Sequence, residues 1–281
     1  MLKQRKKKKI ISSETKREGI NSEQKWAIGL IDGDGHIGIE WSNKEKTKWV
    51  PVLKVTLHRY NSRAIYKLKR ILGIGKITYS GSTATYRVRS KALWCSLLIP
   101  LFTKFHLRSM KYAAVLVIKK ALHTTQIGNT KFKIKTILEL QQSLDRKTDQ
   151  VSPIWSNGAS LEKVLDLDWL AGFMEAEGSF YILKNGQHGF TIGQAYDQHI
   201  IIGIHNFFNL QSGLKNRKNY IMLDTKNTKT LYFIANAINR RLLGIKSFEF
   251  SLWLRTLRKK KKAKSLKAKL IMAQIRKRCD K

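Results

Sequence analysis

The sequence predicts an α+β fold made of two pseudo-symmetric halves, and two observations support this prediction. The stretch WAIGLIDGDGHIGI, which starts at Trp26, returns as WLAGFMEAEGSFYI at Trp169, 143 residues later. After each copy, alternating strands and helical segments follow in the same order. This repeat indicates two halves that each have the order αββαββα.

The first half begins with a helix that carries the first copy of the repeat and that Asn21 or Ser22 can cap. Two strands, a helix, a hairpin and two further helices are then predicted over residues 36–41, 49–57, 61–72, 76–89, 91–101 and 107–122.

The second half repeats this order after its own helix. Strands reach residue 196, a helix covers 198–209, a hairpin lies at 215–225, and helices start at 229 and 247. The polar connection between the halves carries one expected helix around 134–144. We therefore divide the chain into a basic N-terminal tail (1–20), a first half (21–123), a linker (124–165), a second half (166–257) and a basic C-terminal tail (258–281).

The chain is strongly basic, with a net charge of +36 over 281 residues. The first 18 residues contribute +6 and the last 27 contribute +12, so the body between them keeps +18. This distribution predicts a polyanionic partner, and nucleic acid is the first candidate. The N-terminal basic run is interpreted as a solvated tail, whereas for the C-terminal run a binding role stays open.

Two cysteines, Cys95 and Cys279, lie far apart and near no histidine cluster, so neither a disulfide framework nor a zinc site is indicated. This cysteine content suits a reducing compartment. The longest apolar stretch starts at Leu93 and is too short to span a bilayer.

Small residues recur at a spacing of four within each copy of the repeat. Gly29 and Gly33 share one helical face, as do Gly172 and Ala176. Faces without side-chain bulk let two helix backbones approach closely, and the steric part of this rule holds in water as well as in membranes.

An acidic residue ends each of these helices, Asp34 before Gly35 and Glu177 before Gly178. The partial negative charge of a helix C-terminus disfavours an acid by about 0.3–1 kcal/mol. One copy alone is equally consistent with an ordinary helix that has an acidic end and no metal site. Two matching copies favour a shared divalent cation, and carboxylate, carbonyl and water oxygens are ligands that Mg²⁺ takes.

The two copies together resemble the signature of the LAGLIDADG homing endonucleases, in the monomeric form that carries two motifs. The resemblance covers most of residues 20–255, with Ala27 and Ile28 departing from the usual first motif and Glu175 and Glu177 replacing its two aspartates. It implies motif helices packed at a pseudo-twofold axis and two antiparallel sheets that form a DNA-binding saddle. The implied activity is site-specific hydrolysis of both strands of a long asymmetric DNA target during the mobility of an organellar intron.

The resemblance also implies roles for the acids. Asp34 and Glu177 would be metal ligands, and the carbonyls of Gly33 and Ala176 would be additional ones. The implied ion is Mg²⁺, and Mn²⁺ or Ca²⁺ could occupy the same sites. The two earlier acids, Asp32 and Glu175, lie about 200° around the helix from them and are assigned structural roles.

Further catalytic candidates come from the same resemblance. A water-orienting polar residue corresponds to Gln194 in the second half and to His58 in the first, although His58 is equally well interpreted as an ordinary histidine. The implied lysines are Lys111 and Lys246. Lys104 competes with Lys111, and a solvated role is common for any lysine in so basic a chain.

DNA recognition is expected from strand residues that read base edges or fix the backbone. In the first hairpin Tyr86 and Val88 alternate with arginines, which predicts an apolar inner face and a basic outer face. The candidate DNA-binding residues are Lys54, Arg59, Arg87, Arg89, Lys184, Gln187, Lys215, Arg217 and Lys218.

Two other functions compete with the endonuclease. Some members of the resembled family are RNA maturases that help a group I intron to splice, and the basic C-terminal run would suit intron RNA, either alone or beside DNA cleavage. A non-catalytic DNA-binding regulator is the third reading. Both motif acids are present, which argues against simple binding because binding alone does not need two juxtaposed acids.

Overall fold

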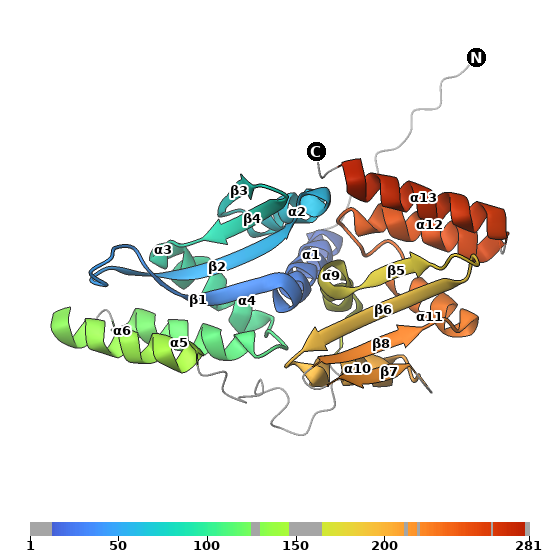
Figure 1. The fold of residues 1–281 in the computed structure, drawn as a ribbon. Helices are drawn as coiled ribbons and strands as arrows, with labels where there is room; N and C mark the ends of the chain where they lie inside the picture. Colours follow the sequence, from blue (N-terminus) through green and yellow to red (C-terminus); the bar gives the residue numbers. More distant parts are fainter. Residues whose placement is uncertain are drawn as a thin grey trace, which may run out of the picture.

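The computed structural model describes residues 13–124, 130–145, 165–210, 213–217, 220–259 and 261–278. Two halves lie side by side, and each contains a four-stranded antiparallel sheet with helices behind it (Figure 1). This arrangement confirms the predicted α+β fold with two pseudo-symmetric halves. No helix in the described part of the chain has the length and apolar character needed to cross a bilayer.

The elements of the first half are, in order, α1 (Ser13–Asp34), β1 (Gly35–Trp41), β2 (Trp49–His58), η1 (Arg59–Asn61), α2 (Ser62–Leu72), β3 (Lys76–Ser80), β4 (Thr83–Val88), α3 (Lys91–Leu93), η2 (Trp94–Leu98), α4 (Ile99–Lys104), α5 (Lys111–Thr124) and α6 (Thr130–Asp145). Those of the second half are α9 (Leu167–Glu177), β5 (Ser179–Ile182), β6 (His188–Ala195), α10 (Gln198–Phe207), β7 (Leu214–Arg217), β8 (Tyr220–Thr225), α11 (Thr228–Ile238), α12 (Lys246–Lys259) and α13 (Lys262–Arg278).

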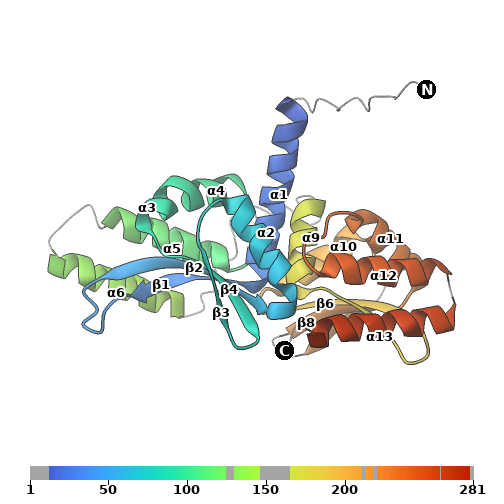
Figure 2. The ribbon, with the colours of Figure 1, turned by 90° about the horizontal axis from the view of Figure 1, so that it is seen from above.

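The two sheets share one topology, with strand order β1-β2-β4-β3 in the first sheet and β5-β6-β8-β7 in the second. Alternate residues of the central strands point into the core, for example Val55 in β2 and Ile192 in β6, which are fully buried. Their neighbours Lys54 and Thr191 lie on the opposite, partly exposed face. Each sheet therefore has one face against helices and one open face (Figure 2).

The two halves meet where α1 packs against α9. Gly29 and Gly172 make this contact possible, because a Cβ atom at Gly29 would lie 1.9 Å from the carbonyl oxygen of Trp169, and one at Gly172 would lie 1.9 Å from that of Trp26. The small-residue spacing thus produces the close backbone approach that it predicts.

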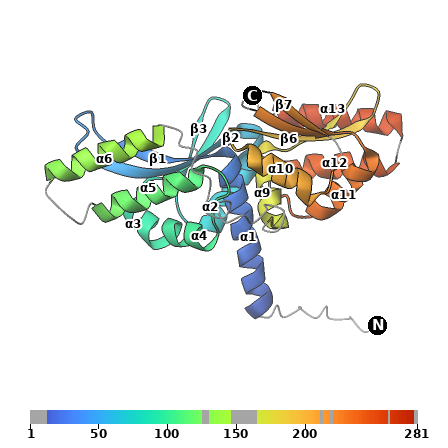
Figure 3. The same cartoon turned by 90° about the horizontal axis from the view of Figure 1, so that it is seen from below.

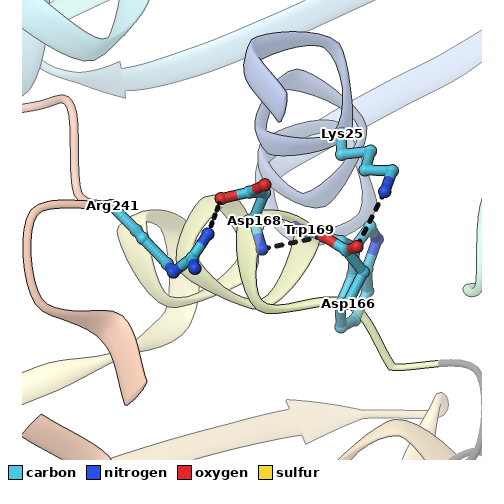
Figure 4. A network of polar contacts seen from close by, with 5 residues as sticks. All are labelled: Lys25, Asp166, Asp168, Trp169 and Arg241. Atoms are coloured by element: carbon cyan, nitrogen blue, oxygen red, sulfur yellow. Dashed lines mark hydrogen bonds and ion pairs between the residues drawn. The ribbon is translucent and has the colours of Figure 1, made fainter. Parts of the chain in front are cut away.

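Ion pairs fix the start of α9 to both halves (Figure 4). Asp166 caps α9 by accepting the backbone N–H groups of Asp168 and Trp169, and it also accepts a 2.8 Å bond from Lys25 of α1. On the other side, Arg241 of the second half pairs with Asp168. Sliding of α9 along α1 would therefore break the bond between Lys25 and Asp166.

Each half ends in a pair of helices, and the two pairs occupy corresponding places. α5 and α6 pack together beside β1, and α12 and α13 pack together beside β5. The sequence-based division assigns α6 to a linker and α13 to a tail, but both are regular helices in equivalent places (Figure 1). The correspondence of α13 to α6 was not predicted because α13 is rich in lysine. Few of its positions are buried, and these are small or apolar residues such as Ala268 and Met272.

Other helix boundaries also differ from the prediction. α1 begins at Ser13, inside the expected tail, and its N-terminal part extends away from both sheets (Figure 3). The helix expected from residue 107 begins at Lys111, because the N–H groups of Arg108 and Ser109 bond to the Asp32 carboxylate instead of leading a helix. The helix expected over 91–101 is divided into α3, a π-helical turn (η2) and α4.

Replacing Gly29 by alanine should lower the free energy of unfolding by about 3 kcal/mol, at the upper end of overpacking costs. The added methyl group would meet backbone atoms of α9, which cannot rotate away. Gly19→Ala in the same helix is the matched control, because no atom lies within 4 Å of a Cβ there and alanine favours a helix by about 0.5–1 kcal/mol. Urea denaturation followed by circular dichroism measures both; equal losses would contradict the close approach.

Candidate active site

Asp34 and Glu177 are the last residues of α1 and α9, and the first sheet strands begin directly after them. The helix ends touch, since a Cβ at Gly33 would lie 2.3 Å from the Cβ of Ala176 and 3.3 Å from the Cγ of Glu177. Both carboxylates are half-buried. The two acids are thus juxtaposed where the halves join.

The electrostatics of this pair are unfavourable to two negative charges. Burial and the neighbouring Asp34 raise the pKa of Glu177 to about 7, against the opposing effect of Lys111 and Lys246. Burial also raises the pKa of Asp34 above its ordinary value. Within the described residues, neither carboxylate accepts a hydrogen bond that would compensate.

The earlier acid of each motif has the opposite environment. Asp32 is fully buried and accepts the backbone N–H of Arg108, the backbone N–H and hydroxyl of Ser109, and the indole N–H of Trp169 at 2.6–3.1 Å. Glu175 is likewise buried and accepts the N–H of Gly244 at 3.0 Å. These acids hold the loops that precede α5 and α12, in line with their expected structural role.

Each anchored loop leads directly to a buried lysine. The ammonium group of Lys111 donates to the carbonyls of Asp32 and Gly33, the latter at 2.7 Å. That of Lys246 donates to the carbonyls of Met174 and Ala176, at 3.3 and 2.9 Å. Burial lowers the pKa of both lysines, and the surrounding acids oppose this shift. Lys104 lies elsewhere, bonded to Asn21, so it does not take the place of Lys111.

Two bonds cross between the halves and hold the same loops. Asp197 of the second half accepts the N–H of Met110, next to Lys111, at 2.8 Å. Asn61 of the first half accepts the N–H of Ile245, next to Lys246, at 3.1 Å. The sequence analysis assigned no role to these two residues. Their equivalent places after the second strand of each half were the available signal.

The two predicted water-orienting residues do not occupy equivalent faces. His58 follows Lys54 and Thr56 on the open face of the first sheet, where its ring lies 5.3 Å from that of Tyr60. Gln194 follows Phe190 and Ile192, so strand alternation directs it to the helix-covered side of the second sheet. The residue of the second half that shares the face of His58 is Ala195, because the two halves differ by one position here.

Comparison with known proteins bears on this geometry. The model of the LAGLIDADG endonuclease family matches residues 27–122. A probable intron-encoded endonuclease of Schizosaccharomyces pombe, Cox1-I1b, is 35% identical over 250 residues, which are 83% of this chain and 64% of that protein. Residues 27–122 thus match the LAGLIDADG family, and the similarity to the S. pombe protein extends over both halves.

Two further similarities extend this comparison. It is 24% identical to the uncharacterized mitochondrial protein RF1 of Saccharomyces cerevisiae over 172 residues, 60% of this chain and 35% of RF1. The structure of I-SmaMI bound to uncleaved DNA target in the presence of calcium ions superposes with a TM-score of 0.70 at 19% identity, covering 90% of this chain and 97% of that one. The chain spans less than two thirds of the S. pombe relative and about a third of RF1.

The donor set at the ends of α1 and α9 fits a hard divalent cation. Burial raises the pKa of both carboxylates, and Asp34 also raises that of Glu177, so a cation between them would favour their charged forms. In the described part of the chain, no group of three or more histidine, cysteine or acidic residues could hold a metal alone. The remaining ligands must therefore come from carbonyls, water or a bound phosphate.

The open face of the first sheet carries a row of basic residues. His36, Lys54, Arg87 and Lys76 pair in register across all four strands. The Arg59 guanidinium, in η1, stacks over the ring of Tyr79, 5.2 Å from its centroid. Arg89, just past β4, pairs with Glu40 at 3.4 Å. The predicted alternation of apolar and basic residues in this hairpin is confirmed.

The open face of the second sheet is chemically different. Asp224 accepts bonds from the Tyr181 hydroxyl and from the Lys215 ammonium group, both at 2.6 Å. Arg217 ends β7 on this face, opposite Tyr220. Lys184 and Gln187 are exposed in the turn between β5 and β6. Lys218, the remaining candidate, lies outside the described residues.

Replacing Asp34 by asparagine and Glu177 by glutamine should stabilise the protein in EDTA by about 1 kcal/mol, because each neutral side chain relieves repulsion at a helix C-terminus. Mg²⁺ or Ca²⁺ should raise the melting temperature of the wild type but not of this variant. Thermal unfolding with and without metal measures both effects.

Asp32→Asn is the contrasting control for that experiment. It should lose about 2–3 kcal/mol, because an amide group cannot accept all the hydrogen bonds that the buried carboxylate accepts. Destabilisation of the Asp34 and Glu177 variant by a similar amount would show that those two acids are structural.

Proposed function

We propose that the chain is a site-specific DNA endonuclease, active as a monomer, that hydrolyses both strands of a long asymmetric target and serves the mobility of its intron in an organelle. The observation that carries this proposal is the juxtaposition of Asp34 and Glu177, without hydrogen-bond partners among the described residues, between two open sheet faces. The names of the S. pombe and S. cerevisiae relatives support the intron-encoded and mitochondrial setting.

Asp34 and Glu177 would hold the metal ions, which we propose to be Mg²⁺. Bound there, the ions would activate water and neutralise charge on the scissile phosphates. The carbonyls of Gly33 and Ala176 already accept bonds from Lys111 and Lys246, so any metal contact must use their second lone pair.

The protein's own groups orient the reaction around these acids. In hydrolysis, water adds to the phosphorus atom and one P–O ester bond breaks, so negative charge grows on the departing oxygen. Lys111 and Lys246 lie buried beside the acids and supply positive charge where it is needed. Because burial lowers their pKa values, each lysine is also better suited to give up a proton than an exposed one.

The two open sheet faces would bind the target over its two halves. Lysine and arginine on the first face suit guanine edges and phosphates, whereas the Tyr181, Asp224 and Lys215 network offers both donors and acceptors. Two faces that differ in this way would favour a target whose halves differ.

The direct test is cleavage of the uninterrupted host-gene junction by purified protein with Mg²⁺. The wild type should cut, EDTA should abolish cutting, and Asp34→Asn combined with Glu177→Gln should lose at least about 100-fold in rate, the scale of losing one transition-state stabilising group, while DNA affinity is retained. Gel assays of cleavage and binding separate the two effects. Binding of this junction without any metal-dependent cutting would refute the endonuclease.

The hydrogen bonds between the halves predict that substitutions in different halves slow cleavage of the same DNA strand. Asn61 holds the loop of Lys246, so Asn61→Ala and Lys246→Met should slow cleavage of the same DNA strand, although their residues belong to different halves. Asp197→Ala and Lys111→Met should slow the other strand. End-labelling each strand separately reads the two rates. Defects that follow the half of the chain, not the bonded loop, would show that these bonds do not position the lysines.

A further inference from the structure

We propose that α13 binds the sugar-phosphate backbone beside one half of the target, so that the protein binds one flank of its DNA with higher affinity than the other. This inference rests on the proposed function and concerns how that DNA is held. The C-terminal basic segment would then bind DNA phosphates through the exposed side of α13.

α13 lies at the edge of the second sheet. It packs against α12 and against β5, the edge strand of the second sheet. Figures 1 and 2 show it alongside this edge at the level of the sheet, whereas α11 and α12 lie behind the sheet. A duplex on the open face would therefore run beside α13.

The pseudo-equivalent helix provides an internal reference. α6 takes the matching place beside β1 in the first half. It has three lysines and two acids, for a net charge of +1, whereas α13 has seven lysines and arginines and no acid. Because the fold also uses this place with a net charge of +1, packing does not require most of the positive charge of α13.

The way α13 is anchored leaves its lysines available. Ser265, Ala268 and Met272 are buried, and Arg276 forms a two-pronged bond of 2.8 and 2.9 Å with the buried carboxylate of Glu249. Lys264 and Lys267 are exposed, and within the described residues neither forms an ion pair. A fixed helix with free cations loses little entropy on binding phosphates.

The length of α13 sets the size of the contact. Its 17 residues span about 25 Å, which corresponds to roughly seven phosphates along one strand of a duplex. Backbone contacts of this kind add affinity that depends on salt but not on base sequence.

The test compares full-length wild type with Lys264→Gln/Lys267→Gln in binding to the junction with Ca²⁺ at several salt concentrations. The variant should lose about tenfold in affinity near 0.15 M salt, and its slope of log K against log salt should be smaller by about 2. Lys264→Arg/Lys267→Arg should bind like the wild type. Melting temperatures establish that each variant is folded.

Two controls make the result specific. Lys119→Gln/Lys120→Gln removes the same charge from exposed positions of α5, which lies behind the first sheet, and should change affinity little (Figure 2). Shortening the duplex at the end under the second half should remove the difference between wild type and the α13 variant, and shortening the other end should keep it. Equal losses for both lysine pairs, or a loss that neither truncation removes, would overturn the proposal.

The proposed endonuclease function can be refuted independently of the α13 contact. If the wild type binds the junction but does not cut it with Mg²⁺, the endonuclease is refuted while the α13 contact is still measured. If the wild type does not bind the junction, both are overturned.

Discussion

The close approach of α1 and α9 is the constraint on which the rest of the structure depends. Gly29 and Gly172 let each helix place its backbone against a carbonyl of the other, and side chains at either position would separate them. Because the sheets begin directly after these helices, the same contact fixes the distance between Asp34 and Glu177 and the relation of the two open faces. A change in this packing would therefore alter the proposed active site and the proposed DNA-binding surface together.

The four motif acids divide into two with satisfied hydrogen bonds and two without. Asp32 and Glu175 accept hydrogen bonds from the loops before α5 and α12 and thereby bring a lysine to each helix end. Asp34 and Glu177 remain half-buried and repel each other, a cost that the packing of the halves imposes. Such a cost is typical of functional positions, where a site is ready for a ligand that relieves it.

Much of this could be predicted from the sequence because the motif is local. Helix, acid, glycine and strand follow within fourteen residues, so the two helices, the two acids and the first strand of each half could be predicted. The bonds of Asn61 and Asp197 were not, since they join residues 184 and 87 positions apart. The face of Gln194 could not be predicted for a different reason: one residue of offset between the halves moves a side chain to the other side of a strand. The helix α13 was read as a tail because lysines outnumber its buried positions.

The halves share the arrangement of acid, lysine and loop at the proposed active site but not their surfaces. Each supplies one acid, one buried lysine and one residue that holds the other half's loop, so neither half can be complete alone. The open faces carry no such constraint, and there a basic row in the first sheet stands against the Tyr181, Asp224 and Lys215 network in the second. For the proposed nuclease, we expect substitutions on these faces to change which DNA is bound without disturbing the reaction, because the groups that position the acids all lie on the other side of the sheets or between the halves. The structure thus separates a site whose two halves depend on each other from surfaces that are free to differ.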